Sequence, residues 1–216
     1  MVNKLKIFNN FNIPNKFKNS IILIGNFDGL HSGHQKLFEL AKKYKTKYKS
    51  KVGVVTFDPI PKMFFNKQIK NYRISNFNQK VIYLKKFGVD FVINKKFDKN
   101  FSKINYHKFI KDILSRKLRS KFIFVSNNFR FGNKREGDVS QLKKYENDFG
   151  YNLINPAPLI KNKKIISSTV IRKLLEEGKL LKANTFLKRN WEIEGKVQRG
   201  RMMGQKIGFP TCNIDI

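Results

Sequence analysis

The chain of 216 residues contains one cysteine, Cys212, so it cannot form a disulfide framework of its own. It has no CxxC pair and no Cys/His cluster, which excludes the usual zinc-binding patterns. No run approaches the ~18 apolar residues that span a bilayer, and residues 1–20 lack the apolar core of a signal peptide. We therefore expect a cytoplasmic protein in a reducing compartment.

Acidic residues are also scarce: 15 Asp and Glu stand against 46 Lys and Arg, which gives a formal net charge of +31. Such an excess is typical of proteins that bind polyanions, because basic side chains release the counterions of a phosphate backbone. The lysines are nevertheless scattered along the chain and are not grouped around stacking aromatics. We expect no dedicated nucleic-acid partner, and a basic nucleic-acid-binding module remains the alternative from another function class.

Hydrophobic residues make up 40% of the chain, enough for a sizeable core. Short apolar runs, typical of strands buried on both faces, alternate with stretches whose apolar residues have helical spacing. The predicted strands are 20–24, 52–57, 91–93, 122–125 and 151–154, and the predicted helices are 35–44, 76–87, 109–118 and 139–149. This alternation indicates right-handed crossovers, so the predicted fold class is α/β, with a Rossmann-like domain built on a parallel sheet.

The end of the chain has a different pattern. Two further helices are expected at 167–177 and 180–187, after which residues 191–197 alternate apolar and polar side chains. That alternation suits a strand of an antiparallel barrel, and the glycines that follow suit tight turns. We therefore predict two domains, 1–185 and 186–216, the second being the beginning of a β-barrel.

Two of the three histidines, His31 and His34, lie in a glycine-flanked turn between the first predicted strand and its helix. Free backbone amides at a helix start bind phosphate, and imidazoles there can donate hydrogen bonds to charge that develops on an α-phosphate. Glycines in segment 25–34 let the backbone approach a nucleotide, where a Cβ would obstruct it. An ordinary turn is the alternative for an isolated His-x-x-His. The whole pattern, placed between a strand and a helix, favours ATP binding.

Segment 25–34, GNFDGLHSGH, resembles the phosphate-binding turn of the prokaryotic bifunctional riboflavin kinase/FAD synthetases, a family within the HxGH nucleotidylyltransferases. Three later segments resemble motifs of that family in the same order, namely 56–61 (TFDPIP), 129–138 (FRFGNKREGD) and 166–172 (ISSTVIR). The chain departs from the family pattern at three positions. Ile60 replaces a His, Ser126 replaces a Gly, and Asn128 stands where many relatives have Asp.

The resemblance implies that MgATP and FMN are the substrates and that the FMN phosphate attacks the α-phosphorus, giving FAD and pyrophosphate. No covalent enzyme intermediate is needed, so catalysis would come from positioning and charge stabilisation. The implied catalytic residues are His31, His34 and Arg172. The implied ATP-binding residues are Gly25, Asn26, Phe27, Asp28, Gly33, Ser167, Ser168 and Thr169. For the Ser-Ser-Thr run alone, a helix N-cap is the alternative.

Segment 126–138 interrupts all periodicity directly after a predicted strand. Ligands of open α/β folds collect at the carboxyl ends of strands, so the interruption is expected to be functional. The resemblance assigns flavin binding to Asn128, Phe129, Arg130 and Phe131. Because the chain contains 21 Phe, a core role is the alternative for either aromatic.

Segment 195–213 resembles the opening of the riboflavin kinase barrel, in which a PTxN segment helps to bind Mg²⁺ and nucleotide. Those roles would fall to Thr211 and Asn213. Most of the barrel, including the family's catalytic carboxylate, is absent from these 216 residues, so kinase activity is not expected from this chain. A full-length parent would also phosphorylate riboflavin. A nucleotidylyltransferase with another acceptor and a chain that binds flavin nucleotide without turnover remain alternatives.

Overall fold

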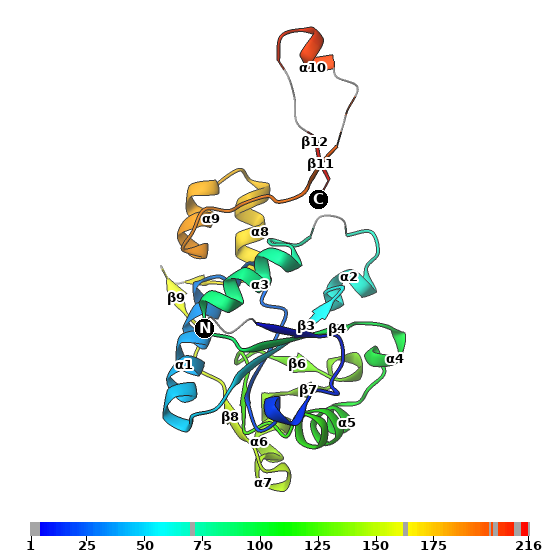
Figure 1. The fold of residues 1–216 in the computed structure, drawn as a ribbon, viewed down its shortest axis with the longest axis vertical. Coiled ribbons are helices and arrows are strands. Elements are labelled where there is room, and N and C mark those ends of the chain that lie inside the picture. The colour runs from blue at the N-terminus through cyan, green and yellow to red at the C-terminus, as the bar shows by residue number, and fades with distance from the viewer. Residues whose placement is uncertain are drawn as a thin grey trace.

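The computed structural model describes residues 5–69, 72–161, 164–198, 200, 203–209 and 213–215. A six-stranded sheet lies at the centre, in the order β1-β4-β3-β2-β5-β8, and every neighbouring pair is parallel (Figure 1). Its strands are β1 (Lys6–Phe8), β2 (Ile21–Ile24), β3 (Val52–Asp58), β4 (Phe91–Lys96), β5 (Phe122–Phe124) and β8 (Asn152–Ile154). The predicted α/β class with a Rossmann-like parallel sheet is confirmed.

The helices begin at local sequence signals. Asn76 with Gln79 and Asp138 with Gln141 form the capping boxes that start two of them. The longer helices are α1 (Ser32–Tyr48), α3 (Phe77–Lys86), the π-helical η3 (Phe109–Lys117), α8 (Ser168–Glu176) and α9 (Leu180–Leu187). The shorter ones are η1 (Asn15–Phe17), η2 (Asp28–Leu30), α2 (Pro61–Phe65), α4 (Lys99–Ser102), α5 (Tyr106–Lys108), η4 (Asn133–Arg135), α6 (Val139–Lys144) and α7 (Glu146–Phe149). Helix α1 is longer at both ends than the predicted 35–44, and α5 continues directly into η3.

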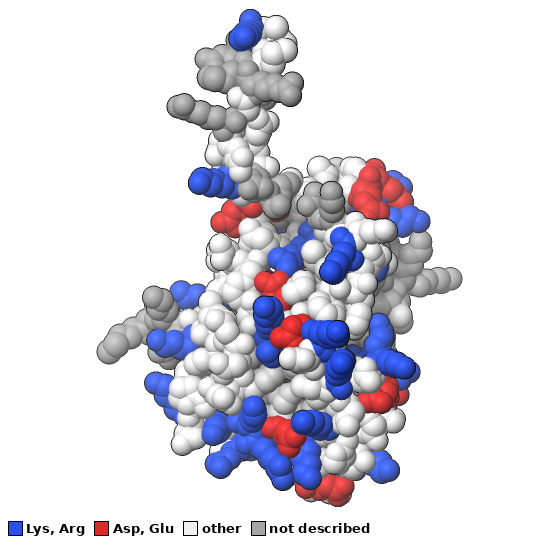
Figure 2. Space-filling model, turned by 90° about the vertical axis from the view of Figure 1, so that its right-hand side faces the viewer, with Lys and Arg blue, Asp and Glu red and all other residues white. Residues whose placement is uncertain are grey.

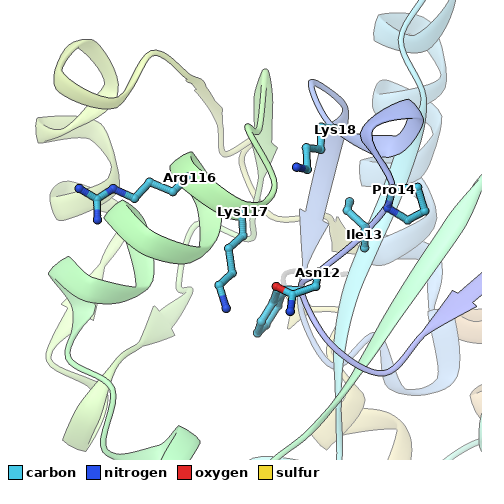
Figure 3. Close-up of a pocket in the computed structure, with 7 residues that line it drawn as sticks. Asn12, Ile13, Pro14, Lys18, Arg116 and Lys117 are labelled. Atoms are coloured by element: carbon cyan, nitrogen blue, oxygen red, sulfur yellow. The ribbon is translucent and has the colours of Figure 1, made fainter.

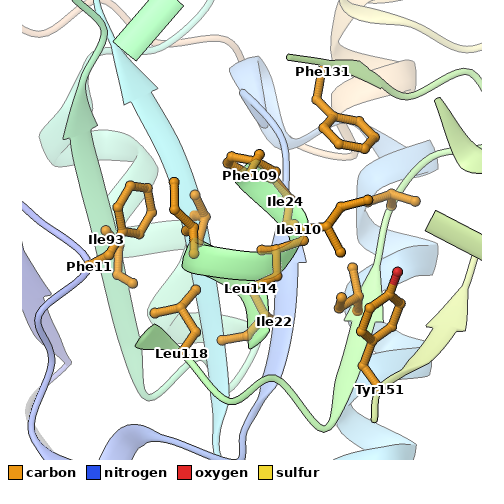
Figure 4. Packing of buried hydrophobic residues seen from close by; sticks show 14 of the residues in the cluster. Phe11, Ile22, Ile24, Ile93, Phe109, Ile110, Leu114, Leu118, Phe131 and Tyr151 are labelled. Carbon is orange, nitrogen blue, oxygen red and sulfur yellow. The ribbon is translucent and has the colours of Figure 1, made fainter. Parts of the chain in front are cut away.

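Side chains from the two faces of the sheet fill two separate cores. Figure 4 shows the core on the side of η3, where Ile22 and Ile24 of β2 belong to the same cluster as Ile110 and Leu114. The other two residues of β2 belong to the cluster on the side of α1 and α3. Burial on both faces explains why the central strands are continuous apolar runs.

The edge strand β1 was not predicted. It is three residues long, Lys6 and Ile7 are exposed, and it pairs with β4 in the register Lys6↔Phe91. A short half-polar sequence carries no strand pattern of its own. The strand exists because β4 offers it an open edge.

Helices α8 and α9 form a third core beside the sheet. Ile171 and Leu174 of α8 pack there with Phe186 and Leu187 of α9, and Trp191 covers the cluster. Both helices lie at their predicted positions. Two-residue strands complete the body as the pairs β6 (Arg130–Phe131) with β7 (Gly137–Asp138) and β9 (Ile160–Lys161) with β10 (Lys164–Ile165).

The end of the chain forms an arm that projects from the main body (Figure 1). It contains the antiparallel strands β11 (Lys196–Gln198) and β12 (Asn213–Asp215) and the short helix α10 (Met203–Lys206). The predicted strand 191–197 is wrong over residues 191–195, which have no regular secondary structure, because Trp191 packs on the third core. Asn213 begins β12, whereas Thr211 lies outside the described residues. The domain boundary near residue 185 stays a prediction.

Basic side chains are distributed over much of the surface. On the face seen in Figure 2, Lys and Arg extend from the arm to the lower end of the body, with acidic side chains among them. Within the described ranges, no helix is both long and apolar enough to cross a membrane.

Candidate functional site

The turn between β2 and α1 lies where the strand order reverses, with β3 on one side of β2 and β5 on the other. Ligands of open α/β sheets bind in the crevice at such a point. Phe27, Gly29 and Leu30 all have positive φ angles, of 46°, 75° and 39°. A Cβ on Gly29 would lie 2.8 Å from Cγ2 of Ile74, so both the backbone and the packing require glycine there.

The side chain of Asp28 holds this turn in place. Its buried carboxylate accepts hydrogen bonds from the backbone N–H groups of Ile74 (3.0 Å) and Ser75 (3.4 Å). Arg172 of α8 donates to the same carboxylate through Nη2 at 2.6 Å, donates to the carbonyl of Tyr72 through Nε at 2.7 Å, and stacks on the Tyr72 ring. Asp28 and Arg172, which the sequence analysis assigned separately to ATP, are therefore hydrogen-bonded to each other in the structure.

The two histidines of the turn form a stacked pair with ring centroids 3.7 Å apart. Nδ1 of His31 accepts the backbone N–H of His34 at 3.4 Å and so caps α1. Burial, reinforced by Arg172, lowers the pKa of His31 to about 4. Burial, followed by the neighbouring His31 and Lys80, lowers the pKa of His34 well below its usual value. Both rings are therefore neutral at pH 7, and His31 keeps Nε2–H as its donor.

Three buried polar atoms of the turn and the start of α1 have no hydrogen-bond partner among the described residues. They are Oδ1 of Asn26, Oγ of Ser32 and Nδ1 of His34. Buried polar groups normally have partners, so such a group of atoms in one place indicates a site that a ligand or water completes.

Lys80 of α3 is a site residue that the sequence analysis missed. It is 5% exposed, and its ammonium donates to the carbonyl of Asn26 at 2.8 Å and to Oγ1 of Thr56 at 3.4 Å. Burial lowers the pKa of Lys80 to about 8. The available signal was its position in the helix, because Lys80 falls on the same face as Phe77 and Leu84, where an apolar residue is expected.

The amino end of α8 lies against the turn. Oγ of Ser168 donates to the carbonyl of Asp28 at 2.9 Å, while Oγ of Ser167 accepts the N–H of Val170 at 3.4 Å as the helix N-cap. Thr169 is exposed. Both hydroxyls of the two serines thus have structural partners, and the N-cap alternative is correct for Ser167.

The loop predicted to bind flavin lines a pocket of about 390 Å³. The lining residues are Asn127, Asn128, Phe129, Arg130, Arg135, Asp138, Val139 and Ser140. Phe131 is not among them: it is 8% exposed and belongs to the core, where its ring lies 5.4 Å from that of Phe109. For Phe131 the core alternative holds, and Phe129 stacks on its outer side at 5.4 Å.

The three departures from the family pattern each have a local partner. Oγ of Ser126 donates to Oδ1 of Asn128 at 2.9 Å, so the two replaced loop positions are bonded to each other. Ile60 is 3% exposed and its carbonyl accepts the N–H groups that start α2. An apolar residue therefore fills a buried position there.

A second pocket, of about 530 Å³, lies at the amino ends of the strands, away from the turn. It is bounded by the loop before β2 and by the end of η3, which contribute Lys18 and Lys117. Figure 3 shows Lys117 directed toward Asn12, whereas Arg116 points away. None of the predicted site residues lines this pocket.

A family model described as FAD synthetase matches residues 13–170 of the chain, which include the turn, the loop and most of the motif 166–172. The chain belongs to the FAD synthetase family. A second family model, described as riboflavin kinase, matches residues 187–216 of this family member.

Curated relatives of this FAD synthetase family member include the bifunctional riboflavin kinase/FMN adenylyltransferases of Buchnera aphidicola from Acyrthosiphon pisum and of Escherichia coli K12. The first is 40% identical over 94% of the chain and 65% of that protein. The second is 35% identical over 91% of the chain and 63% of that protein. The chain thus spans less than two thirds of the length of these relatives. A solved structure titled macrolide-efflux protein from Streptococcus pneumoniae matches with a TM-score of 0.81 and 27% identity, over 97% of this chain and 68% of that one.

Proposed function

We propose that the chain is an FMN adenylyltransferase, which transfers AMP from ATP to FMN and releases pyrophosphate. The observation that carries the proposal is the set of three unpaired buried polar atoms, on Asn26, Ser32 and His34, in a chain of the FAD synthetase family. The names of its bifunctional relatives support the same acceptor.

In the proposed reaction, an oxygen of the FMN phosphate attacks the α-phosphorus of ATP. The bond from that phosphorus to the β-phosphate oxygen breaks, and the oxygen leaves on pyrophosphate. The attacking phosphate oxygen is already ionised near pH 7, so no proton has to be removed from the nucleophile. His31 and His34, as neutral rings, would donate N–H hydrogen bonds to the α-phosphate. The free amides at the start of α1 would bind the same group.

The β- and γ-phosphates would lie at the start of α8. Arg172 uses Nε and Nη2 for Tyr72 and Asp28, so we assign its Nη1 to a phosphate. Thr169, whose side chain is exposed, is the hydroxyl of the Ser-Ser-Thr run that we assign to phosphate. The serines would act through the backbone conformation they stabilise.

Mg²⁺ is part of the proposal as the partner of ATP. Among the described residues there is no cluster of three His, Cys, Asp or Glu side chains. Mg²⁺ commonly binds through substrate phosphates and water with few protein ligands, which fits a turn that supplies amides and imidazoles. When bound, the ion would neutralise charge on the triphosphate.

The flavin is assigned to the pocket lined by Asn128, Phe129 and Arg130. The exposed side of Phe129 offers an aromatic surface for an isoalloxazine ring. Arg130 and Asp138, which both line this pocket, form an ion pair at 3.0 Å that orients the guanidinium.

The test is the reaction itself. FMN, ATP and Mg²⁺ incubated with the chain should yield FAD and pyrophosphate, and His34→Ala should slow turnover by roughly 10²-fold or more. His107→Ala is the matched control, because His107 packs on Tyr145 and Phe149 and not on the turn. Turnover of His34→Ala at the wild-type rate would defeat its assigned role. Activity with only a non-flavin acceptor in a substrate panel would replace FMN by that acceptor.

We keep two broader assignments as proposals. The single cysteine supports a reducing, cytoplasmic compartment. Riboflavin phosphorylation is proposed only for a protein in which a complete kinase barrel follows residues 187–216, the segment that the riboflavin kinase model matches.

A further inference from the structure

The segment that follows α9 binds directly to the turn between β2 and α1, which we call the nucleotide turn. This segment nevertheless belongs to the part of the chain that the riboflavin kinase model matches. Nη2 of Arg189 donates to the carbonyl of Gly29 at 2.8 Å, and Nη1 donates to the carbonyl of Leu187 at 3.3 Å. The guanidinium carbon lies 4.0 Å from the centroid of the Tyr83 ring. Three interactions therefore fix one arginine in place against the turn.

Trp191 binds the other half of the same structure. Its Nε1–H donates to the carbonyl of Ile74 at 2.9 Å. The N–H of Ile74 in turn donates to the carboxylate of Asp28, the anchor of the turn. Arg189 thus binds the turn itself at Gly29, and Trp191 binds the segment at Ile74 that is hydrogen-bonded to Asp28.

Two further contacts extend this docking along neighbouring elements. Nε2 of Gln35 donates to the carbonyls of both Leu30 and Leu187, at 2.9 Å each. Nε2 of Gln79 donates to the carbonyl of Glu192 at 3.1 Å. The segment 187–192 is therefore bonded to the start of α1 and the start of α3, not only to α9.

The turn needs external support because its backbone is unfavourable by itself. Non-glycine residues in the left-handed region cost of order 1–3 kcal/mol each, and such residues persist only where their surroundings hold them. Phe27 and Leu30 are two such residues, and they flank Asp28 and Gly29. Hydrogen bonds from a charged donor are the strong ones, so the bond from Arg189 to Gly29 is well suited to hold this conformation.

We propose that Arg189 and Trp191 are positioning residues for the nucleotide site, and that they set the conformation of the turn through the carbonyls of Gly29 and Ile74. The inference rests on the proposed function for its kinetic readout. The adenylyltransferase unit then extends through Trp191, past the predicted boundary near residue 185. The six residues 187–192, which contact the turn and the helices beside it, connect the arm to this unit.

The experiment uses the full chain and three variants. Arg189→Met keeps the side-chain stem and removes the donors, Trp191→Phe keeps an apolar ring and removes the N–H, and Arg189→Lys restores the charge. Arg116→Met is the matched control, because this exposed arginine pairs with Asp112 on η3. We expect Arg189→Met to raise the KM for ATP about tenfold or more, with a smaller rise in Trp191→Phe and partial recovery in Arg189→Lys. The KM for ATP of the control Arg116→Met should equal that of wild type. The KM for FMN should be the same in all variants.

Hydrogen exchange of the amides in segment 25–34 provides a readout that needs no substrate. Exchange there should be faster in Arg189→Met than in wild type, while exchange in the sheet stays the same. If both the KM for ATP and the exchange rates equal those of wild type, the positioning role is wrong. A variant with a lower melting temperature but an unchanged KM for ATP shows a structural role only, which also overturns the proposal. If wild type itself makes no FAD, the proposed function fails, and the exchange measurement alone decides the positioning role.

Discussion

Replacement of His31 should change how the stability of the protein depends on pH. Burial and Arg172 lower the pKa of His31 from 6.5 to about 4, and the ring is 5% exposed. Between these two pH values the unfolded chain binds a proton at His31 and the folded chain does not, so stability falls as the pH falls. A shift of this size corresponds to about 3 kcal/mol, fully present above pH 6.5 and lost by about pH 4.

The variant His31→Asn isolates this contribution, because Asn can still accept the N–H of His34 as a helix N-cap. Free energies of unfolding would be measured by urea titration at several pH values from 4 to 7.5. We expect the variant to lose about 3 kcal/mol less than wild type over this range. His107→Asn serves as the control with the same change of residue type outside the turn. Equal pH dependence in wild type and His31→Asn would refute the reasoning.

Three further substitutions test other parts of the site. The free energy of unfolding of wild type should rise as the pH rises from about 8, the pKa of Lys80, to 10.5. Lys80→Met should abolish this rise in urea titrations. The same variant should slow FAD formation about tenfold. Gly29→Ala should lower the free energy of unfolding by about 1–3 kcal/mol, measured the same way, because of its positive φ and the contact with Ile74. Phe131→Ala should cost about 3–5 kcal/mol, and a loss below about 1 kcal/mol would contradict its place in the core.

Features with a local cause could be predicted from the sequence. The starts of the helices predicted at 76–87 and 139–149 and the apolar run of β2 each depend on residues a few positions apart, and the structure has them where the pattern indicates. Strand β1 could not be predicted, because its only cause is the free edge of β4, more than eighty residues along the chain. Trp191 was predicted to be in a strand for a similar reason: the carbonyl that binds its indole lies 117 positions away.

The same distinction applies to the site. The turn is contiguous, so its histidines and glycines could be identified from their spacing. Lys80 is one of 46 basic residues, and its place on the apolar face of α3 was a weak signal that its burial beside Asn26 makes clear. Asp28 and Arg172 were both assigned to ATP, but the sequence could not show that they bond to each other across 144 positions.

The bond between Arg172 and Asp28 has a consequence for the timing of entropy loss. A free arginine side chain loses about 2 kcal/mol of rotamer entropy when it is immobilised. Here Nε and Nη2 are already held by Tyr72 and Asp28, so that loss occurs when the chain folds and not when a ligand arrives. A polyphosphate would meet a guanidinium whose orientation is already chosen, and its affinity would not be reduced by ordering this side chain.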